Sequence, residues 1–495
     1  MKISELYLIH SVKCKLPKIK TYMKMKKYLM TGVLAIVSVF VIAQHKSMNC
    51  ELFRYSGPGL KQIGWLATKH SKEIQSSAWS VGCETLDRDY AKFSIYKDYV
   101  GELGVKHARL QSGWAKCEKE KGKYNFEWLD SCVYGLAEQS VKPWICLCYG
   151  NPLYGSGIRL GAKIFTDEKA MEAWLKYVSA TVSRYKNVVN EWEVWNEPNL
   201  GNGGYEEYST LLMKTAETIK KVQPNAIIMG FSLAGLPLKF AEEVFKILKE
   251  NNKLELVDRL TYHPYTCNPD DSYTEIAKLE ALKNTYNPKI KLYQGENGCP
   301  SILEWTHALN NYPWTEISQA KWFMRRMAGD RVRDIPSSIF TIIDLRYYNM
   351  LQSFGLIRSN LLHEIIYKRP SYYGVQHMVN VFDDTVKPVG ELEYTSNAYR
   401  KMTVAGFKKE GSPLVLVWYK DQIPGDELKW ELVNLTIKNT NFKDPVYVEM
   451  ISGKVFEIGK PDWENKGTDV VFKNLPVWDS VMMIAERSQV IVKPE

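Results

Sequence analysis

Residues 191–204, EWEVWNEPNLGNGG, begin like a buried strand but end in an unusual way. In an extended chain Glu191, Glu193 and Glu197 lie on one face, and apolar side chains alternate with them. Pro198 follows directly, and proline has no N–H to continue a strand ladder. Proline also favours extended geometry in the residue before it. We therefore expect a strand that ends by holding the Glu197 carboxylate at its tip in a restricted, extended conformation.

Similar segments recur between residues 78 and 383, separated by helix-like segments such as DEKAMEAWLKYVSATVSRYK at 167–186. Each is short, rich in β-branched or aromatic residues, and bounded by glycine, proline or polar residues. The candidate strands are WSVGCE (79–84), KHARLQ (106–111), KPWICLCY (142–149), NEWEVWN (190–196), AIIMGF (226–231), DRLTYHPY (258–265), IKLYQGE (290–296) and IFTIIDL (339–345). This alternation predicts an α/β fold, a (β/α)8 TIM barrel over residues 78–383. A doubly wound open sheet is the alternative, but no glycine-rich phosphate-binding turn follows the first strand.

Residues 384–495 have a different pattern from the barrel region. Short strand-like segments such as LVLVWYK (414–420) alternate with turn residues, and helical periodicity is weak. They predict an accessory antiparallel β-sandwich. Residues 44–77 form a lead segment before the first barrel strand, and we expect them to add a strand to this sandwich.

The N-terminal residues 1–43 have the composition of a signal peptide. A lysine-rich start precedes an apolar run from about Tyr28 to Ala43, and small residues precede Gln44. A membrane anchor is the weaker interpretation, because the run is shorter than the ~20 residues that a spanning helix needs. We therefore expect export to the periplasm or the extracellular space, with no membrane attachment once the signal is removed.

Charge and metal-ligand patterns exclude several classes of partner. The net charge of +9 comes largely from eight lysines within residues 1–43, and the remaining chain is close to neutral, at +2. This balance gives no electrostatic basis for a nucleic-acid partner. The nine cysteines and eight histidines show neither a CxxC pair nor metal-ligand spacing, so we expect no metal and no other cofactor. Disulfide pairing and oligomeric state stay open.

Two strand ends carry a glutamate in an unusual setting. The fourth candidate strand leads to Glu197, and the seventh, in LYQGENG (292–298), leads to Glu296 between two glycines. Chemistry in TIM barrels takes place at the C-terminal ends of the strands. Strands four and seven lie on opposite sides of the barrel mouth, so both carboxylates can face one cleft. Solvated strand-end acids are the alternative, but we predict a catalytic pair.

Several motifs resemble those of the clan A glycoside hydrolases, and they occur in the right order over about 300 residues. WEVWNEPN (192–199) resembles the acid/base motif of the fourth strand, and LYQGENG resembles the nucleophile motif of the seventh. ARLQ (108–111), TYHPY (261–265) and KRPSYYGVQHM (368–378) resemble the clan motifs of the second strand, the sixth strand and the eighth helix. Within the clan the chain is most similar to family 39, which includes β-xylosidases and α-L-iduronidases and also ends in a β-sandwich.

This resemblance implies a retaining glycoside hydrolase that cleaves O-glycosidic bonds of a poly- or oligosaccharide by double displacement. Glu296 is then the nucleophile and Glu197 the acid/base, which starts protonated because the negative Glu296 lies beside it. The implied supporting residues are Asn196, which binds the sugar 2-hydroxyl; Arg109, which keeps Glu296 ionised; and His263 and Tyr265, which orient Glu296 or bind sugar. By their positions at the first strand tip and on a rim loop, Glu84 and Trp114 are further candidates for substrate contact, and a structural role is the alternative for each.

Two features leave the exact activity open. Many clan members carry a sugar-binding tryptophan at the tip of the eighth strand, but this chain has Asp344, Tyr347 and Tyr348 there. Further aromatic residues fall on the predicted rim loops, namely Tyr149, Tyr154, Trp305 and Trp314. A transglycosylase with the same two glutamates and an inactive sugar-binding barrel are the alternatives. The sugar, the linkage, and exo or endo cleavage stay open.

Overall fold

The structure, a computed structural model, describes residues 57–201 and 204–493. The predicted signal peptide at 1–43 and residues 44–56 of the lead segment lie outside the described residues. Among the described residues, no helix combines the length and apolar character needed to cross a membrane.

Eight parallel strands close into a barrel, which confirms the predicted TIM-barrel class. They are β2 (Trp79–Gly82), β3 (His107–Gln111), β6 (Lys142–Leu147), β7 (Glu191–Val194), β8 (Ile227–Ala234), β9 (Arg259–His263), β10 (Lys291–Asn297) and β11 (Ser337–Ile339). Each strand pairs with its neighbours in sequence, and β11 closes the barrel by pairing with β2. All eight C-terminal ends therefore meet at one face.

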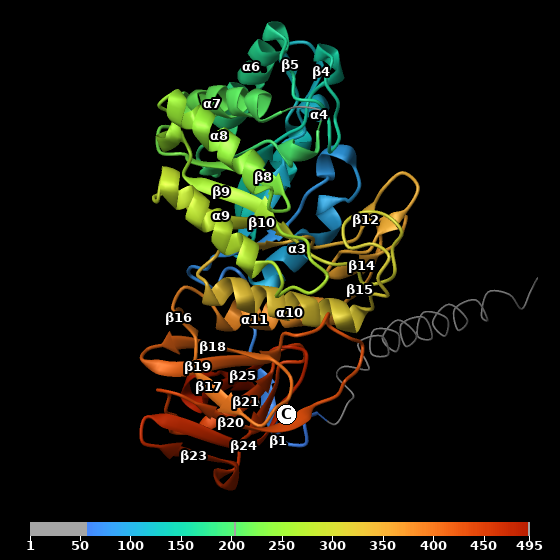
Figure 1. The fold of residues 1–495 in the computed structure, drawn as a ribbon. Coiled ribbons are helices and arrows are strands. Elements are labelled where there is room, and N and C mark those ends of the chain that lie inside the picture. Colours follow the sequence, from blue (N-terminus) through green and yellow to red (C-terminus); the bar gives the residue numbers. More distant parts are fainter. Residues whose placement is uncertain (1–56, 202–203, 494–495) are drawn as a thin grey trace, which may run out of the picture. The chain divides into compact units, whose positions relative to one another are not determined.

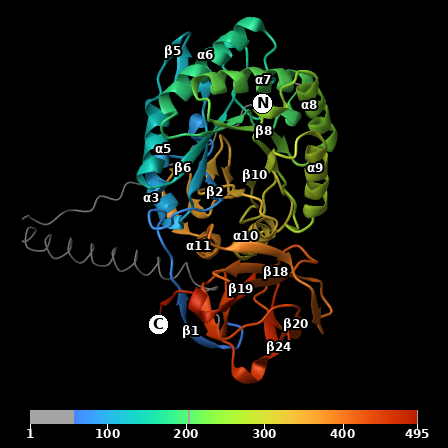
Figure 2. The same cartoon turned by 90° about the vertical axis from the view of Figure 1, so that its left-hand side faces the viewer.

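Helices follow the strands and form an outer ring (Figures 1 and 2). They are α3 (Phe93–Leu103), α5 (Glu127–Glu138), α6 (Glu168–Tyr185), α7 (Tyr205–Val222), α8 (Leu238–Glu250), α9 (Tyr273–Tyr286), α10 (Glu316–Val332) and α11 (Pro370–Val381). In α6 the Asp167 side chain accepts a hydrogen bond from the Ala170 N–H and caps the first turn. Its buried stripe, with Met171, Trp174 and Val178, has helical spacing and packs on the barrel.

The predicted eighth strand, residues 339–345, is wrong in its bounds. The ladder covers only Ser337–Ile339, and the apolar residues after it continue as a buried connection. Asp344 at the end of this connection forms an ion pair with Arg369, the residue that precedes α11. Two short hairpins follow, β12 (Leu345–Arg346) with β13 (Leu351–Gln352), and β14 (Ile357–Ser359) with β15 (Ile365–Lys368).

Two antiparallel sheets make up the C-terminal region. An eight-stranded sheet has the order β16-β18-β19-β25-β21-β22-β1-β26, and a four-stranded sheet has the order β17-β20-β24-β23. The bounds are β1 (Lys61–Leu66), β16 (Lys387–Glu391), β17 (Tyr394–Ser396), β18 (Met402–Lys409), β19 (Ser412–Tyr419), β20 (Glu431–Ile437), β21 (Pro445–Glu449), β22 (Lys454–Glu457), β23 (Trp463–Lys466), β24 (Asp469–Val477), β25 (Met482–Glu486) and β26 (Val492–Lys493). Strand β1 comes from the lead segment, so both ends of the described chain enter this sheet.

The sandwich and the barrel are joined mainly through α10. This helix contacts β16 and β18, and it is buried on all sides because it lies between the two parts. Lys321 forms an ion pair with Asp479 of the sandwich. Arg325 pairs with Asp270 of the barrel and donates to the Gln422 carbonyl of the sandwich. Buried charges are tolerated when they are paired in this way.

Candidate active site

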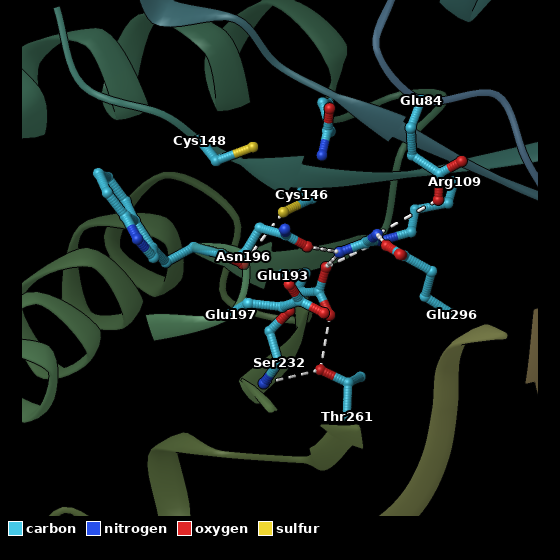
Figure 3. Close-up of polar contacts among 12 residues, drawn as sticks. Glu84, Arg109, Cys146, Cys148, Glu193, Asn196, Glu197, Ser232, Thr261 and Glu296 are labelled. Atoms are coloured by element: carbon cyan, nitrogen blue, oxygen red, sulfur yellow. Dashed lines mark hydrogen bonds and ion pairs between the residues drawn. The ribbon is translucent and has the colours of Figure 1, made fainter. Parts of the chain in front are cut away.

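Glu197 and Glu296 meet at the C-terminal face of the barrel (Figure 3). Glu197 directly precedes the short helix η3 (Pro198–Leu200), and Glu296 lies in β10. One carboxylate oxygen of each, together with His263 Nδ1, lie within 4.8 Å of one another. Glu197 is 8% exposed and the Glu296 side chain is 12% exposed, so both are recessed yet reachable. Among the described residues, Glu197, His263 and Glu296 are also the side chains whose ligand atoms lie close enough together to hold a metal ion.

The backbone of Glu197 is not extended, contrary to the prediction from Pro198. Its φ is 51°, in the left-handed region, and that of Trp195 is 68°. Such conformations cost a non-glycine residue on the order of 1–3 kcal/mol each and persist only where the surroundings enforce them. Here the Glu197 N–H donates to the Ser232 carbonyl of β8, and the Leu200 N–H donates to the Glu197 carbonyl. These bonds outweigh the preference that proline imposes.

Arg109 organises the base of the site, as Figure 3 shows. Its Nη1 donates to Glu296 Oε2 at 2.6 Å and to Glu84 Oε1 at 3.2 Å. Its Nη2 donates to Glu193 Oε2 at 2.5 Å and to Asn196 Oδ1 at 2.7 Å. The side chain is fully buried, so Arg109 does not reach the cavity and acts through Glu296. Arg109 thus places a positive charge directly beside the Glu296 carboxylate.

Glu193 is a site residue that the sequence analysis did not identify. Its Oε1 accepts a hydrogen bond from the Thr261 hydroxyl, and its Oε2 pairs with Arg109. Burial raises the pKa of Glu193, but the charges of Arg109 and His263 outweigh burial and lower it overall. The sequence indicated Glu193 only through its position, because in an extended chain it lies on the same face as Glu197.

His263 and Tyr265 lie beside different carboxylates. His263 Nδ1 is 2.8 Å from Glu197 Oε1 and 3.8 Å from Glu296 Oε2. Burial lowers the pKa of His263, but the charge of Glu296 and the hydrogen bond with Glu197 raise it overall. The Tyr265 hydroxyl donates to Glu296 Oε1 at 2.8 Å. Tyr265 therefore holds one oxygen of Glu296, whereas His263 is hydrogen-bonded to Glu197.

Asn196 links the base of the site to its wall. Its Oδ1 accepts from Arg109, and its Nδ2 donates to the Tyr149 hydroxyl at 2.9 Å. An amide nitrogen carries two hydrogens, so one remains for a sugar hydroxyl. The Arg88 guanidinium lies 5.1 Å from the centre of the Tyr149 ring. Arg88 and Tyr149 thus belong to this wall, and Arg88 gave no signal in the sequence.

Glu84 does not reach the substrate, so the predicted contact is wrong. It is 2% exposed, and its Oε2 has no hydrogen-bond partner among the described residues. Burial raises the pKa of Glu84 to about 8, against a lowering by Arg109 and a further rise from Glu296. The carboxyl is therefore protonated at neutral pH, and it accepts the hydrogen bond from Arg109 as a neutral group.

Glu84→Gln is expected to change how stability depends on pH. In the unfolded wild-type chain Glu84 loses its proton near pH 4.5, whereas the folded protein keeps it up to about pH 8. Between these values a rise in pH favours the unfolded wild type, because it binds fewer protons there. The free energy of unfolding of Glu84→Gln relative to wild type should therefore rise from pH 4.5 to 8 and level off above. Urea denaturation at several pH values measures this difference, and a flat difference contradicts a protonated Glu84.

Trp114 is not a sugar-binding residue, and the prediction that it contacts substrate is wrong. It lies in α4 (Trp114–Cys117), is 0% exposed, and stacks on Tyr154 at 5.1 Å. Its Nε1 donates to Glu118 Oε2 at 2.6 Å, next to the hairpin of β4 (Glu118–Glu120) and β5 (Lys123–Tyr124). Trp114 therefore lies in the packed interior of this rim loop.

Trp114→Ala is accordingly expected to act on stability. It removes a fully buried indole and leaves Glu118 without that donor, so the free energy of unfolding should fall by about 3–5 kcal/mol. The urea midpoint measures this loss. Exposed Trp305→Ala is the matched control and should shift the midpoint little. An unchanged midpoint in Trp114→Ala would contradict the buried position.

The fold and the paired carboxylates define the class of protein: a TIM barrel with two carboxyl groups close together at the C-terminal ends of its strands. Residues 106–292 match the sequence profile described as Glycosyl hydrolases family 39, so the predicted resemblance to that family is confirmed. This matched segment includes Glu197 and ends just before Glu296.

Solved structures show the same fold. A family 39 glycoside hydrolase from the gut symbiont Bacteroides cellulosilyticus WH2 is 18% identical, with a TM-score of 0.62 over 83% of this chain and 81% of that chain. A monomeric β-xylosidase from Caulobacter crescentus CB15 is 15% identical, with a TM-score of 0.54 over 86% of this chain and 97% of that one. A GH30 endoxylanase from Clostridium papyrosolvens C71 is 13% identical, with a TM-score of 0.55 over 86% and 98%. No curated protein matches the sequence.

Proposed function

We propose that this chain is a retaining glycoside hydrolase in which Glu296 is the nucleophile and Glu197 the acid/base. The observation that carries the proposal is the approach of the two carboxyl groups, with one oxygen of each within 4.8 Å of the other. Retaining pairs lie about 5–5.5 Å apart, whereas inverting pairs lie at about 6.5–9.5 Å to admit a water molecule. The short separation leaves direct attack by a carboxylate as the available route.

In the first step a Glu296 oxygen attacks the anomeric carbon while the bond to the leaving oxygen breaks. Glu197 gives its proton to that oxygen, and a glycosyl ester of Glu296 forms. Hydrogen bonds from Arg109 and Tyr265 orient the Glu296 carboxylate for this attack. The remaining Asn196 amide hydrogen is placed to bind a sugar hydroxyl beside the reacting carbon.

In the second step water attacks the anomeric carbon and the ester bond breaks. Glu197 takes the proton from the water, and Glu296 leaves as a carboxylate. Glu197 gave up its proton in the first step, so it enters the second step as the carboxylate that acts as the base.

A transglycosylase would follow the same two steps with an acceptor sugar in place of water, and the ratio of hydrolysis to transfer products separates the two. An inactive sugar-binding barrel is disfavoured, because both carboxylates are present with Arg109 and Tyr265 bound to Glu296. Export directed by residues 1–43 is part of the proposal, and N-terminal sequencing of the mature protein tests it.

The proposal is tested by trapping the intermediate. A screen of nitrophenyl glycosides first identifies the accepted sugar, and an activated 2-fluoro glycoside of that sugar is then added. Peptide mass spectrometry should find the sugar covalently attached to Glu296. Two outcomes would contradict the role of Glu296. Either the enzyme turns over the nitrophenyl glycoside but acquires no label, or the label is found on another residue.

A further inference from the structure

Exposed apolar side chains are concentrated on one face of the barrel. Of fifteen large exposed hydrophobic residues in the described chain, ten lie on loops that follow β6, β7, β10 and β11. These four strands form two adjacent pairs, and β7 and β10 carry the glutamates. Apolar surface gathered around a buried polar site marks a place where something apolar binds.

One side of this surface adjoins the acid/base. Leu200 lies three residues after Glu197 in the sequence and is 53% exposed. Its loop is held in place, since Asn199 exchanges two hydrogen bonds with Ala234 of β8. Leu160, 49% exposed, belongs to the neighbouring loop, where a Cβ added to Gly161 would lie 3.8 Å from the Leu200 carbonyl oxygen.

The other side lies on the loop that follows Glu296. It presents Ile302, Leu303 and Trp305, the last of them 74% exposed. The buried Glu304 between them accepts hydrogen bonds from the Ser353 N–H and hydroxyl, which fixes the loop.

This second loop also adjoins the wall of the site. His307 packs on Tyr347, with ring centres 4.5 Å apart. Tyr347 in turn packs on Tyr90 at 4.5 Å, and the Arg88 guanidinium lies over the rings of both Tyr90 and Tyr149. The loop therefore borders the same mouth as Leu200.

We propose that Leu160, Leu200, Ile302, Leu303 and Trp305, here called the apolar rim, bind an apolar aglycone. The inference rests on the proposed function, because an acid/base protonates the leaving oxygen and Glu197 therefore marks the side on which the aglycone leaves. Sugar units require hydrogen-bonding groups and flat aromatic faces, whereas four of the five rim residues are aliphatic. The rim thus favours a glycoside with an alkyl or aryl leaving group over the poly- or oligosaccharide that the family resemblance implies.

A series of alkyl glycosides of the accepted sugar, from methyl to octyl, tests this inference. Their leaving groups have similar basicity, so the chain length changes mainly the apolar area that can be buried. Complete burial of a methylene would raise kcat/KM roughly fourfold. An open rim covers only one side of the alkyl chain, so we expect kcat/KM to rise about twofold per methylene. We expect a steady rise from methyl to octyl.

Leu200→Ser and Trp305→Ala should flatten this rise, because they remove apolar contact surface. Leu432→Ser in β20 is the matched control, since Leu432 is 61% exposed and lies in the sandwich. It should leave the rise unchanged. The inference is overturned by a flat series in the wild type, by an unchanged rise in Leu200→Ser, or by a rise with added sugar units instead of methylenes. If the enzyme turns over no glycoside at all, including the nitrophenyl glycosides, the proposed function is contradicted, and this inference is contradicted with it.

Discussion

Glu296→Ala lowers kcat/KM on the order of 10⁵-fold or more for every glycoside tested, as is typical when a covalent nucleophile is removed. The reason is that no other described carboxylate can reach the anomeric carbon from the same side. Glu193 is fully buried against Arg109, and Glu84 is nearly as inaccessible. Steady-state kinetics on the best nitrophenyl glycoside measure the loss.

Azide makes this prediction more specific. In Glu296→Ala the small anion can occupy the vacated side and attack the anomeric carbon once, which gives a glycosyl azide of inverted configuration. Normal product stereochemistry should not return. Glu275→Ala, at a solvent-exposed ion pair on α9, is the control and should retain wild-type rates. Residual activity in Glu296→Ala within tenfold of wild type would contradict its role.

Glu197→Ala should separate substrates according to their leaving groups. Removal of a general acid costs about 10²–10⁴-fold where the leaving oxygen needs a proton, as in methyl or octyl glycosides. A dinitrophenyl leaving group departs as a stable anion, so bond cleavage in its glycosides should be far less affected. Deglycosylation still lacks its base, so these substrates should show a burst followed by a slow steady state. Equal losses on activated and alkyl glycosides would contradict the assignment of Glu197 as the acid.

Much of the barrel could be predicted because its signals are local. Each strand is a short β-branched or aromatic run, and each helix carries its own apolar stripe. The end of the eighth strand could not be predicted in this way. Residues 340–343 are nearly as apolar as a strand, and only the structure shows that they continue as a buried connection beyond the ladder.

The catalytic pair was predictable for a similar reason, since both glutamates sit at strand ends that the barrel topology brings together. The residues that contact the two glutamates were harder to predict. Arg109 and Tyr265 were found through the motifs, but Glu193 matters only because Arg109 and Thr261 from other strands point at it. Trp114 shows the converse, because whether a rim aromatic faces sugar or core depends on how loops distant in sequence pack on it.

The configuration of the first-formed product tests the central claim most directly. Proton NMR of a reaction mixture within its first minutes distinguishes the two anomers of the released sugar before they equilibrate. Two carboxyl groups this close require two displacements at the anomeric carbon, so the product should first appear with the configuration of the substrate. First appearance of the opposite anomer would mean that water attacks directly, and the assignment of Glu296 as a nucleophile would then be wrong.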